Sequence, residues 1–311
     1  MGIAPLQRMS LVLAVTLLGG GIGGAAAHAQ ARRQPVVRHI DHIMIRTDVP
    51  DELYAFFVDT LPLPVAWPLA ERGGVTSGGV GFGNVDVEAI EFPGQRAEPR
   101  PTHLVGFAFE PVALDESLAE LRRRGIAHGE PRPFVSTAPD GTRSTFFTNV
   151  TLSQFSDADR PAAATPHVFL SEYSPQYVDV QRRRARLRRE LAARAGGPLG
   201  VLRVVEIVVG TTDLDAADRL YEKLLAPTTR VSGAWPIGDG PAIRLVRAEQ
   251  NLIQRLVVGV VSLDRTRAFL EERGLLGSTS ETRATLAASE IHGLDIVLFE
   301  VDAADDDAPS E

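Results

Sequence analysis

The chain carries a fourfold internal repeat, in which a short apolar, strand-like run leads into an aspartate that opens an amphipathic helix. In every copy the aspartate lies nine residues after the first strand residue, and an apolar residue follows six positions later. The leading residues and their aspartates are His42 and Asp51, Gly106 and Asp115, Glu206 and Asp215, and Arg255 and Asp264. A unit of this size cannot bury its apolar face alone and must stack on its copies. The repeat therefore predicts an architecture built from four similar pieces.

Only the first copy of the repeat begins with a histidine. The leading position is His42 in that copy and is glycine, glutamate or arginine in the other three. Imidazole is the commonest protein ligand of divalent transition metals. We therefore expect any metal chemistry of this chain to lie around His42.

The composition is that of a compact protein and not of a disordered or fibrous one. The 311 residues are 44% hydrophobic and 23% charged, which is enough chain for two domains. The formal net charge is −8, and five of the negative charges belong to the last ten residues, so the remainder is only mildly acidic. This charge balance argues against a nucleic-acid partner. The absence of cysteine excludes disulfides and thiolate ligands.

The N-terminus has the pattern of a secretory signal peptide. Arg8 is followed by an apolar run from Leu11 to Leu18 and then by Ala27-His28-Ala29, which predicts cleavage after residue 29. The apolar run is shorter than the roughly 20 residues that a membrane span requires. We expect a periplasmic or secreted protein with no membrane association after cleavage; an uncleaved anchor is the alternative.

The remaining chain is predicted to form strands and helices in the order β-α-β-β-β, repeated. The expected organisation is a first domain at 36–176, a linker at 177–198, a second domain at 199–302 and a disordered acidic tail at 303–311. The linker is strongly basic and ends at Gly196-Gly197-Pro198, a combination that stops a helix. We interpret it as a solvated helix whose Leu187 and Leu191 pack beneath, with binding to an anionic surface as the alternative.

Paired β-α-β-β-β modules, a histidine in the first strand and a carboxylate in the fourth resemble the vicinal oxygen chelate superfamily, and glyoxalase-like domain proteins in particular. The superfamily includes glyoxalase I, extradiol dioxygenases, fosfomycin-resistance enzymes and bleomycin-binding proteins. The resemblance covers about residues 36 to 302. It implies an α+β fold of two tandem domains, each an open, cup-shaped mixed sheet made of two βαβββ modules.

The resemblance also implies a metal site in the first domain. His42 matches the first-strand ligand, Glu88 the fourth-strand carboxylate and Glu172 the last-strand carboxylate. The sequence departs from the family at the second histidine, because the repeat places Gly106 there. His103 lies three residues earlier, on the opposite strand face if pairing is regular, and becomes a ligand only through a bulge or a register shift.

Such a donor set suits a divalent ion such as Zn, Ni, Co, Mn or Fe(II) that polarises a small substrate with neighbouring oxygen atoms. In a lyase or isomerase, Glu172 or Glu88 would move protons; a ring-cleaving dioxygenase would need two histidines and one carboxylate on Fe(II). The structural alternatives are a buried core histidine at position 42 and an ion pair of Arg46 with one of the glutamates.

The second domain is predicted to be degenerate. Its equivalent positions hold Glu206, Arg244, Arg255 and Glu300, and two arginines would repel a cation. We expect these residues to form structural ion pairs; an arginine pair that holds an anionic ligand is the alternative. The two functional hypotheses are an exported, metal-dependent lyase, isomerase or dioxygenase acting on a small molecule, and a metal-free protein that sequesters a small compound. Homodimer formation is left open.

Overall fold

The computed structural model describes residues 34–92, 101–137, 140–155 and 166–302. The predicted signal peptide at 1–29 and the predicted tail at 303–311 lie outside these ranges, and both stay predictions. Among the described helices, none is long and apolar enough to cross a membrane.

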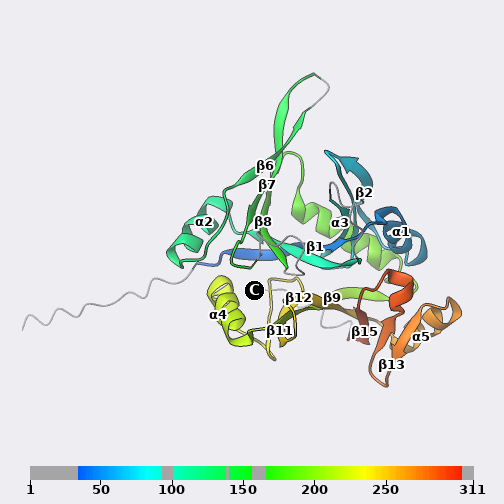
Figure 1. The fold of residues 1–311 in the computed structure, drawn as a ribbon. Coiled ribbons are helices and arrows are strands. Elements are labelled where there is room, and N and C mark those ends of the chain that lie inside the picture. Colours follow the sequence, from blue (N-terminus) through cyan, green and yellow to red (C-terminus); the bar gives the residue numbers. More distant parts are fainter. Residues whose placement is uncertain (1–33, 93–100, 138–139, 156–165, 303–311) are drawn as a thin grey trace, which may run out of the picture. The chain divides into compact units, whose positions relative to one another are not determined.

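The first half of the chain forms one curled, mixed sheet of eight strands (Figure 1). Its elements are β1 (Val37–Arg46), α1 (Pro50–Ala55), the π-helix η1 (Phe56–Thr60), β2 (Val65–Arg72), β3 (Val75–Gly81), β4 (Asp86–Glu91), β5 (His103–Pro111), α2 (Leu114–Arg123), β6 (Arg132–Thr137), β7 (Arg143–Thr151) and β8 (His167–Tyr173). The strand order across the sheet is β2-β3-β4-β1-β5-β8-β7-β6. Helix α1 begins at a proline because the first turn of a helix does not use that backbone N–H.

The second half forms a mixed sheet of seven strands in the order β10-β11-β9-β12-β15-β14-β13. Its elements are β9 (Val201–Thr211), α4 (Leu214–Leu225), β10 (Ala234–Trp235), β11 (Ala242–Arg247), β12 (Leu252–Val260), α5 (Leu263–Glu272), β13 (Leu276–Thr279), β14 (Ala284–Leu286), the 3-10 helix η3 (Ala288–Ile291) and β15 (Ile296–Glu300). Side chains of Asp213 and Ser262 accept backbone N–H groups at the starts of α4 and α5, which satisfies donors that a helix leaves open.

The two sheets share one plan. In the first, β1 pairs in parallel with β4 and antiparallel with β5, and β5 pairs in parallel with β8. In the second, β9 pairs in parallel with β11 and antiparallel with β12, and β12 pairs in parallel with β15. The predicted α+β fold of paired βαβββ modules is therefore confirmed. One difference is that only two strands, β10 and β11, follow α4 before β12 begins.

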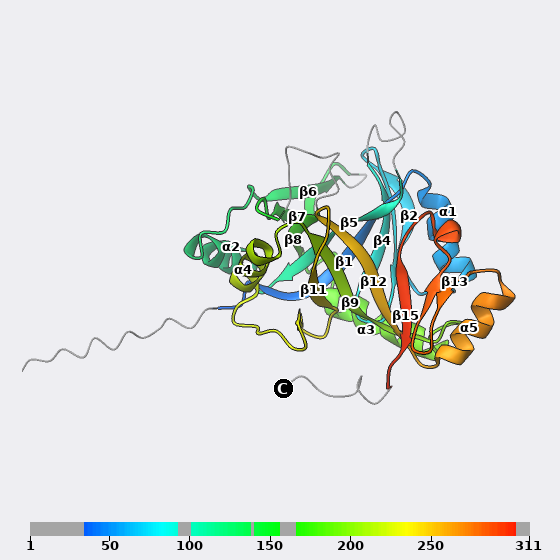
Figure 2. The same ribbon diagram turned by 60° about the horizontal axis from the view of Figure 1, so that its bottom comes forward.

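A hydrophobic core common to both sheets holds the fold together. Ile43 of β1 and Phe107 of β5 are fully buried in the same cluster as Ile207 of β9 and Leu256 of β12. Strands β5 and β12 lie side by side in Figures 1 and 2, and residues of the two strands are in contact. Because side chains alternate along a strand, the neighbours of the core residues on β1 face away from this core.

The alternation is broken on β1 at Asp41. In the pairing with β5, Ile40 lies opposite Phe109 and His42 lies opposite Ala108, so Asp41 is an extra residue in the ladder. A bulge of this kind bends the strand and changes the direction of its side chains. As a result the adjacent side chains of Asp41 and His42 contact each other.

Helix α3 (Val180–Ala193) connects the two sheets in the chain and lies between β2 and the β7–β8 side of the first sheet (Figure 1). Leu187 and Leu191 are buried, as predicted. The prediction of a solvated arginine face is wrong for part of the helix, because the side chains of Arg183 and Arg184 are only 11% and 6% exposed. The two arginines are buried because they pair with acidic side chains of the first sheet, Asp41, Asp86 and Glu110, which lie outside the linker.

The side chain of Asn84, in the turn between β3 and β4, is one of the polar links between the two halves. Asn84 donates from Nδ2 to the carbonyl of Val204 at 3.0 Å and accepts from the N–H of Val204 at 3.0 Å. Its Nδ2 also donates to the carbonyl of Asp239 at 3.2 Å. Asn84 is buried, so these bonds satisfy polar groups that would otherwise be costly to bury.

Candidate functional site

The structure brings together two of the predicted site residues, His42 and Glu88. They lie on the parallel neighbours β1 and β4, where His42 pairs with Asp86 and Met44 pairs with Glu88. Nε2 of His42 is 3.6 Å from Oε2 of Glu88, and both side chains are 12% exposed. The two groups are therefore close enough to share a proton or to bind one small molecule.

The other ring nitrogen of His42 faces a carboxylate that the sequence analysis missed. Nδ1 is 2.8 Å from Oδ2 of Asp41, a residue that is almost completely buried. Regular alternation would place adjacent residues on opposite faces, and only the bulge at Asp41 allows this contact. The segment Ile40-Asp41-His42 contains no residue that signals a bulge, so the contact between Asp41 and His42 could not be identified from their positions in the sequence.

Helix α3 supplies the positive charge of the site. Arg183 lies 2.6 Å from Oδ1 of Asp41 through NH2 and 3.0 Å from Oδ2 of Asp86 through Nε. Arg184 lies 3.5 Å from Oδ1 of Asp41 and donates to Glu110 at 2.6 Å. The bonds from Arg183 to Asp41 and from Arg184 to Glu110 are charged hydrogen bonds, the stronger kind in proteins, and they fix α3 against β1 and β5. The contact of Arg183 with Asp86 on β4 is an ion pair.

Aromatic rings surround the charged groups. The guanidinium of Arg183 lies over the rings of Trp67 and Tyr173, at 5.7 and 5.1 Å from their centroids. Trp67 also makes an edge contact with the ring of His42 at 6.1 Å. The hydroxyl of Tyr173 donates to Asp41 at 3.1 Å. The row of rings continues from Tyr173 to Phe147, which stacks on the exposed Phe134.

The arginines keep Asp41 ionised. Burial alone would raise the pKa of Asp41, but the charge of Arg183, the hydrogen bond from His42 and the charge of Arg184 hold that pKa well below its usual range. An ionised carboxylate only accepts hydrogen bonds, so it fixes the proton of His42 on Nδ1. The lone pair of neutral His42 is then on Nε2, the nitrogen that faces Glu88.

The remaining groups have pKa values displaced toward neutrality. Burial lowers the pKa of His42, but the hydrogen bond to Asp41 and the charge of Glu88 outweigh burial, so that pKa is raised overall. Burial raises the pKa of Glu88, partly offset by the charge of His42 and a hydrogen bond from Ser77. Burial also raises the pKa of Asp86 to about 6, against the opposing charge of Arg183. Such displaced values are typical of sites that transfer protons.

Glu172 lies elsewhere, and its predicted role as a ligand and proton carrier is not supported by its position. Its Oε1 accepts the N–H of Leu114, the first residue of α2, at 2.8 Å. The next residue, Tyr173, points to Asp41, so Glu172 is directed to the opposite face of β8. Glu172 therefore satisfies an open backbone donor of α2 and offsets its helix dipole.

His103 is also outside the cluster. It pairs with Arg46 at the start of β5, four residues beyond His42 on β1, which is about 13 Å at ~3.3 Å per residue. Its Nδ1 donates to the carbonyl of Pro101 at 2.8 Å. The bulge that turning His103 inward would require is present in this ladder, but it does not bring His103 to His42.

The described residues do not form the predicted metal site. Of the expected donors only His42 and Glu88 converge, and no group of three histidine, aspartate or glutamate side chains in the described ranges is arranged to hold a metal ion. The nearby Asp41 and Asp86 are bound to Arg183, a permanent cation. The donor set therefore does not fit a chelated divalent metal in this arrangement.

The second half has no equivalent cluster at the corresponding positions. Arg244 donates from Nε to Glu206 at 2.8 Å, and Arg255 lies 2.8 Å from Asp295. Glu300 accepts the N–H of the first residue of α5 at 2.9 Å. These contacts agree with the structural interpretation of the positions in the second half.

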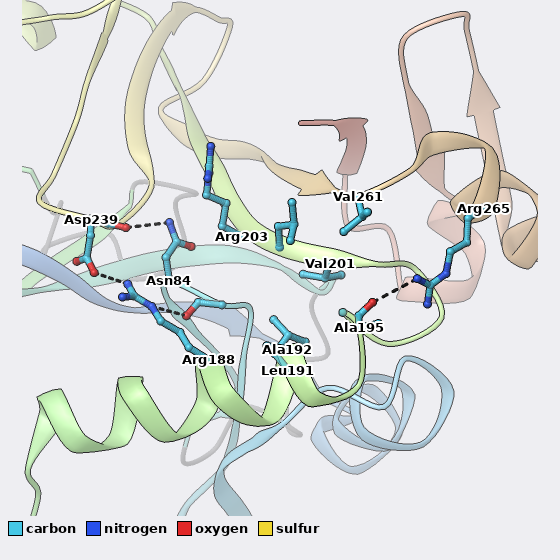
Figure 3. A pocket seen from close by; sticks show the side chains of 13 residues that line it. Asn84, Arg188, Leu191, Ala192, Ala195, Val201, Arg203, Asp239, Val261 and Arg265 are labelled. Atoms are coloured by element: carbon cyan, nitrogen blue, oxygen red, sulfur yellow. Dashed lines mark hydrogen bonds and ion pairs between the residues drawn. The ribbon is translucent and has the colours of Figure 1, made fainter. Parts of the chain in front are cut away.

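A separate cavity of about 420 Å³ lies between α3 and the second half. In Figure 3, Arg188, Asn84 and Asp239 line one side of it, and Arg265 with Ala195 lines the other. Arg188 is paired with Asp239, and Arg265 donates to the carbonyls of Ala195 and Gly197. These charged groups already have protein partners, so the His42 cluster is the better candidate for chemistry.

Comparison with known proteins gives structural relatives only. No protein-family model matches the chain, and no curated protein matches its sequence. Among solved structures, an extradiol ring-cleaving dioxygenase from Brevibacterium fuscum is similar with a TM-score of 0.55 and 13% identity, over 90% of this chain and 76% of that one. A hypothetical protein from Staphylococcus aureus is similar with a TM-score of 0.54 and 9% identity, over 85% of this chain and 99% of that one. The E323L mutant of homoprotocatechuate 2,3-dioxygenase from the first organism has a TM-score of 0.54 and 14% identity, over 88% and 74% of the two chains.

These likenesses establish the fold. The chain has the vicinal oxygen chelate fold that the sequence resemblance implied. At such low identity the fold carries no activity with it, because one fold supports many reactions. Function must therefore be argued from the His42 cluster.

Proposed function

We propose that the first half of the chain is a proton-transfer site of the lyase or isomerase type for a small substrate with neighbouring oxygen atoms. His42 is the acid–base group, Asp41 orients it, and Glu88 is its partner on the substrate side. The observation that carries the proposal is the position of His42 between two carboxylates, 2.8 Å from Asp41 and 3.6 Å from Glu88.

The reaction follows from this geometry. Neutral His42 accepts at Nε2 a proton from a carbon next to a substrate carbonyl, and the electron pair of that C–H bond passes to the carbonyl oxygen. The imidazolium so formed is stabilised by ionised Asp41. In this step Glu88 acts in its protonated form and donates a hydrogen bond to the developing enediolate oxygen. Glu88 then passes its proton to that oxygen and takes the proton of the neighbouring hydroxyl group, and return of the first proton from His42 to the former carbonyl carbon completes an isomerisation without an external oxidant.

The surroundings of His42 favour an aromatic substrate. Trp67 and Tyr173 flank the charged cluster with π surfaces, and a planar molecule can stack on the ring faces that the Arg183 guanidinium does not cover. The apolar side chains of Met44, Ile90 and Val105 form a separate small cluster together with Phe169. Met44 lies two residues from His42 on β1, and Ile90 lies two residues from Glu88 on β4, so the apolar cluster continues the same strand faces.

Hydrogen exchange tests the proposal directly. We expect the protein to exchange deuterium from D2O into the CH2 group of 2-hydroxyacetophenone, observed by ¹H NMR, and we expect His42→Ala to slow the exchange by roughly 10²- to 10⁴-fold. His128→Ala is the control, because the His128 ring donates to the carbonyl of the adjacent Gly129 and lies in the segment between α2 and β6, on none of the elements that carry the cluster. Exchange that is unaffected by His42→Ala would remove His42 from the reaction.

A sequestering protein is the second candidate, favoured by the row of aromatic rings from Phe134 to Tyr173. It predicts that 2-hydroxyacetophenone binds without exchange and that His42→Ala still binds it. Metal analysis of the purified protein separates both candidates from the metal-dependent enzyme: stoichiometric metal that is lost in His42→Ala would support the metal enzyme, and its absence would support the two metal-free candidates.

A further inference from the structure

We infer that Asp239, which belongs to the second half of the chain, is a positioning residue for the His42 site. Through this one residue, by its side chain and its backbone carbonyl, the second half holds β1, α3 and the β3–β4 turn in the arrangement that the site needs. The inference rests on the proposed role of His42, but it concerns the position of the ring and is measured independently of turnover.

Asp239 contacts three separate elements of the first half. Its Oδ1 lies 2.6 Å from Nε2 of His39 on β1. Its Oδ2 accepts a hydrogen bond from Arg188 on α3. Its backbone carbonyl accepts from Asn84 in the β3–β4 turn at 3.2 Å. One residue of the second half is therefore bonded to β1, to α3 and to the turn that leads into β4.

Each contact is close in sequence to a site residue. His39 precedes Asp41 by two residues, and Asn84 precedes Asp86 by two residues. Arg188 follows Arg183 by five residues on the same helix, about 7.5 Å along its axis. A shift of α3 at Arg188 would be transmitted to Arg183, because a helix of this length moves as a rigid rod over one and a half turns.

The loop that carries Asp239 is packed directly against the backbone of β1. Gly238 has φ of +56°, and a Cβ atom at this position would lie 2.5 Å from the carbonyl oxygen of Arg38. A Cβ at Gly240 would lie 3.1 Å from the ring of His39. His39 itself is only 2% exposed, and its Nδ1 lies 2.5 Å from the carbonyl of Ile40. The loop at 238–240 therefore packs closely on β1, and the ring of His39 is enclosed between them.

A positioning role and a merely stabilising role of Asp239 predict different results when its side chain is changed. If Asp239 only added stability, its loss would lower the free energy of unfolding and leave the His42 ring unchanged in the folded protein. If Asp239 positions the site, its loss would relax Arg183, weaken the contact of Arg183 with Asp41 and change which nitrogen of His42 carries the proton.

The test is ring ¹H–¹⁵N NMR on the full chain labelled with ¹⁵N-histidine, with the His42 signals assigned by their absence in His42→Gln. We expect mainly the Nδ1-protonated form in the wild type and at least a twofold rise in the Nε2-protonated fraction in Asp239→Asn. Asp295→Asn is the matched control, because Asp295 is also a carboxylate of the second half paired with an arginine, Arg255. The control should leave the His42 signals unchanged.

Arg188→Gln provides a second route if Asp239→Asn does not fold. It breaks the same contact from the α3 side and should move the His42 signals in the same direction; where both variants fold, the double variant should show less than the sum of the two effects. A folded Asp239→Asn or Arg188→Gln protein with wild-type His42 signals would overturn the inference. Shifted signals in a protein that does not exchange 2-hydroxyacetophenone would instead retain the inference and remove the proposed function.

Discussion

Glu172 accepts a hydrogen bond from the backbone N–H of Leu114 at 2.8 Å, and this bond joins the last strand of the first sheet to the first residue of α2. Glu300 makes the corresponding bond to Leu263 of α5 at 2.9 Å in the second sheet. A glutamate at the corresponding position thus accepts the first helix N–H in both halves, although only the first half contains the His42 cluster. A glutamate at this position is sufficiently explained by helix capping.

Removal of either capping carboxylate should cost stability and leave the candidate site intact. We expect Glu172→Ala and Glu300→Ala each to lower the free energy of unfolding by about 0.5–2 kcal/mol, measured by urea denaturation, because an open helix donor loses its acceptor. The His42 ring signals should not move in either variant. A displaced His42 signal in Glu172→Ala would restore Glu172 to the site.

Arg183 should be far more important for stability than its neighbours on the exposed side of α3. Arg183→Met leaves Asp41 and Asp86 without their main counter-charge, and we expect a loss of about 3–5 kcal/mol, as found when one partner of a buried ion pair is removed. Arg186→Met is the matched control, since the Arg186–Glu190 pair is solvent-exposed and worth about 0–1 kcal/mol. Equal losses in the two variants would contradict the buried role of Arg183.

Asp86 should make the protein less stable as the pH rises. Its pKa is about 6 in the folded protein and 3.8 in its ordinary state, so between these values the folded chain binds more protons than the unfolded one. The free energy of unfolding therefore falls as pH increases from 4 to 6, by up to about 3 kcal/mol for a shift of two units. We expect Asp86→Asn to gain stability relative to the wild type over this window, measured by urea denaturation at pH 4, 5, 6 and 7. A difference between the two proteins that is constant with pH would contradict the raised pKa.

Gly79 should be required for the position of Trp67. A Cβ atom at Gly79 would lie 2.5 Å from the Trp67 ring, so Gly79→Ala must displace that ring from His42. We expect a loss of about 1–3 kcal/mol, as for other overpacked sites, together with a change in tryptophan fluorescence. Gly129→Ala is the control, because the nearest atom to its added Cβ is 3.7 Å away. Unchanged fluorescence in Gly79→Ala would show that Trp67 does not occupy this position.

The fold could be predicted from the sequence because its signals are local and repeated. An apolar run and an aspartate nine residues later recur four times, and each copy places a strand before a helix. Helix α3 was also predictable from its charge pattern and its Gly-Gly stop. Glu172 at the end of β8 was assigned as a metal ligand from the family resemblance, because a capping carboxylate and a metal ligand look alike in one strand.

The candidate site was only half predictable. His42 follows from the repeat and Glu88 from the family resemblance, and the two meet because β1 and β4 are parallel neighbours. Asp41 and Arg183 do not follow, because one depends on a bulge and the other on where a basic helix docks. The six arginines of α3 were the available signal. So many arginines on one helix could have indicated buried carboxylates elsewhere in the chain as their partners.

The two bonds between Asn84 and Val204 resemble those between paired β-strand residues. The side-chain amide of Asn84 donates to the carbonyl of Val204 and accepts from its N–H, as the backbone of a neighbouring strand would. Loss of either half would leave both of these groups, and the shared hydrophobic core, exposed to water. The two sheets are therefore one cooperative folding unit, and their thermal unfolding should occur in a single transition. Although the two sheets share one plan, we therefore do not expect either to fold as a separate half.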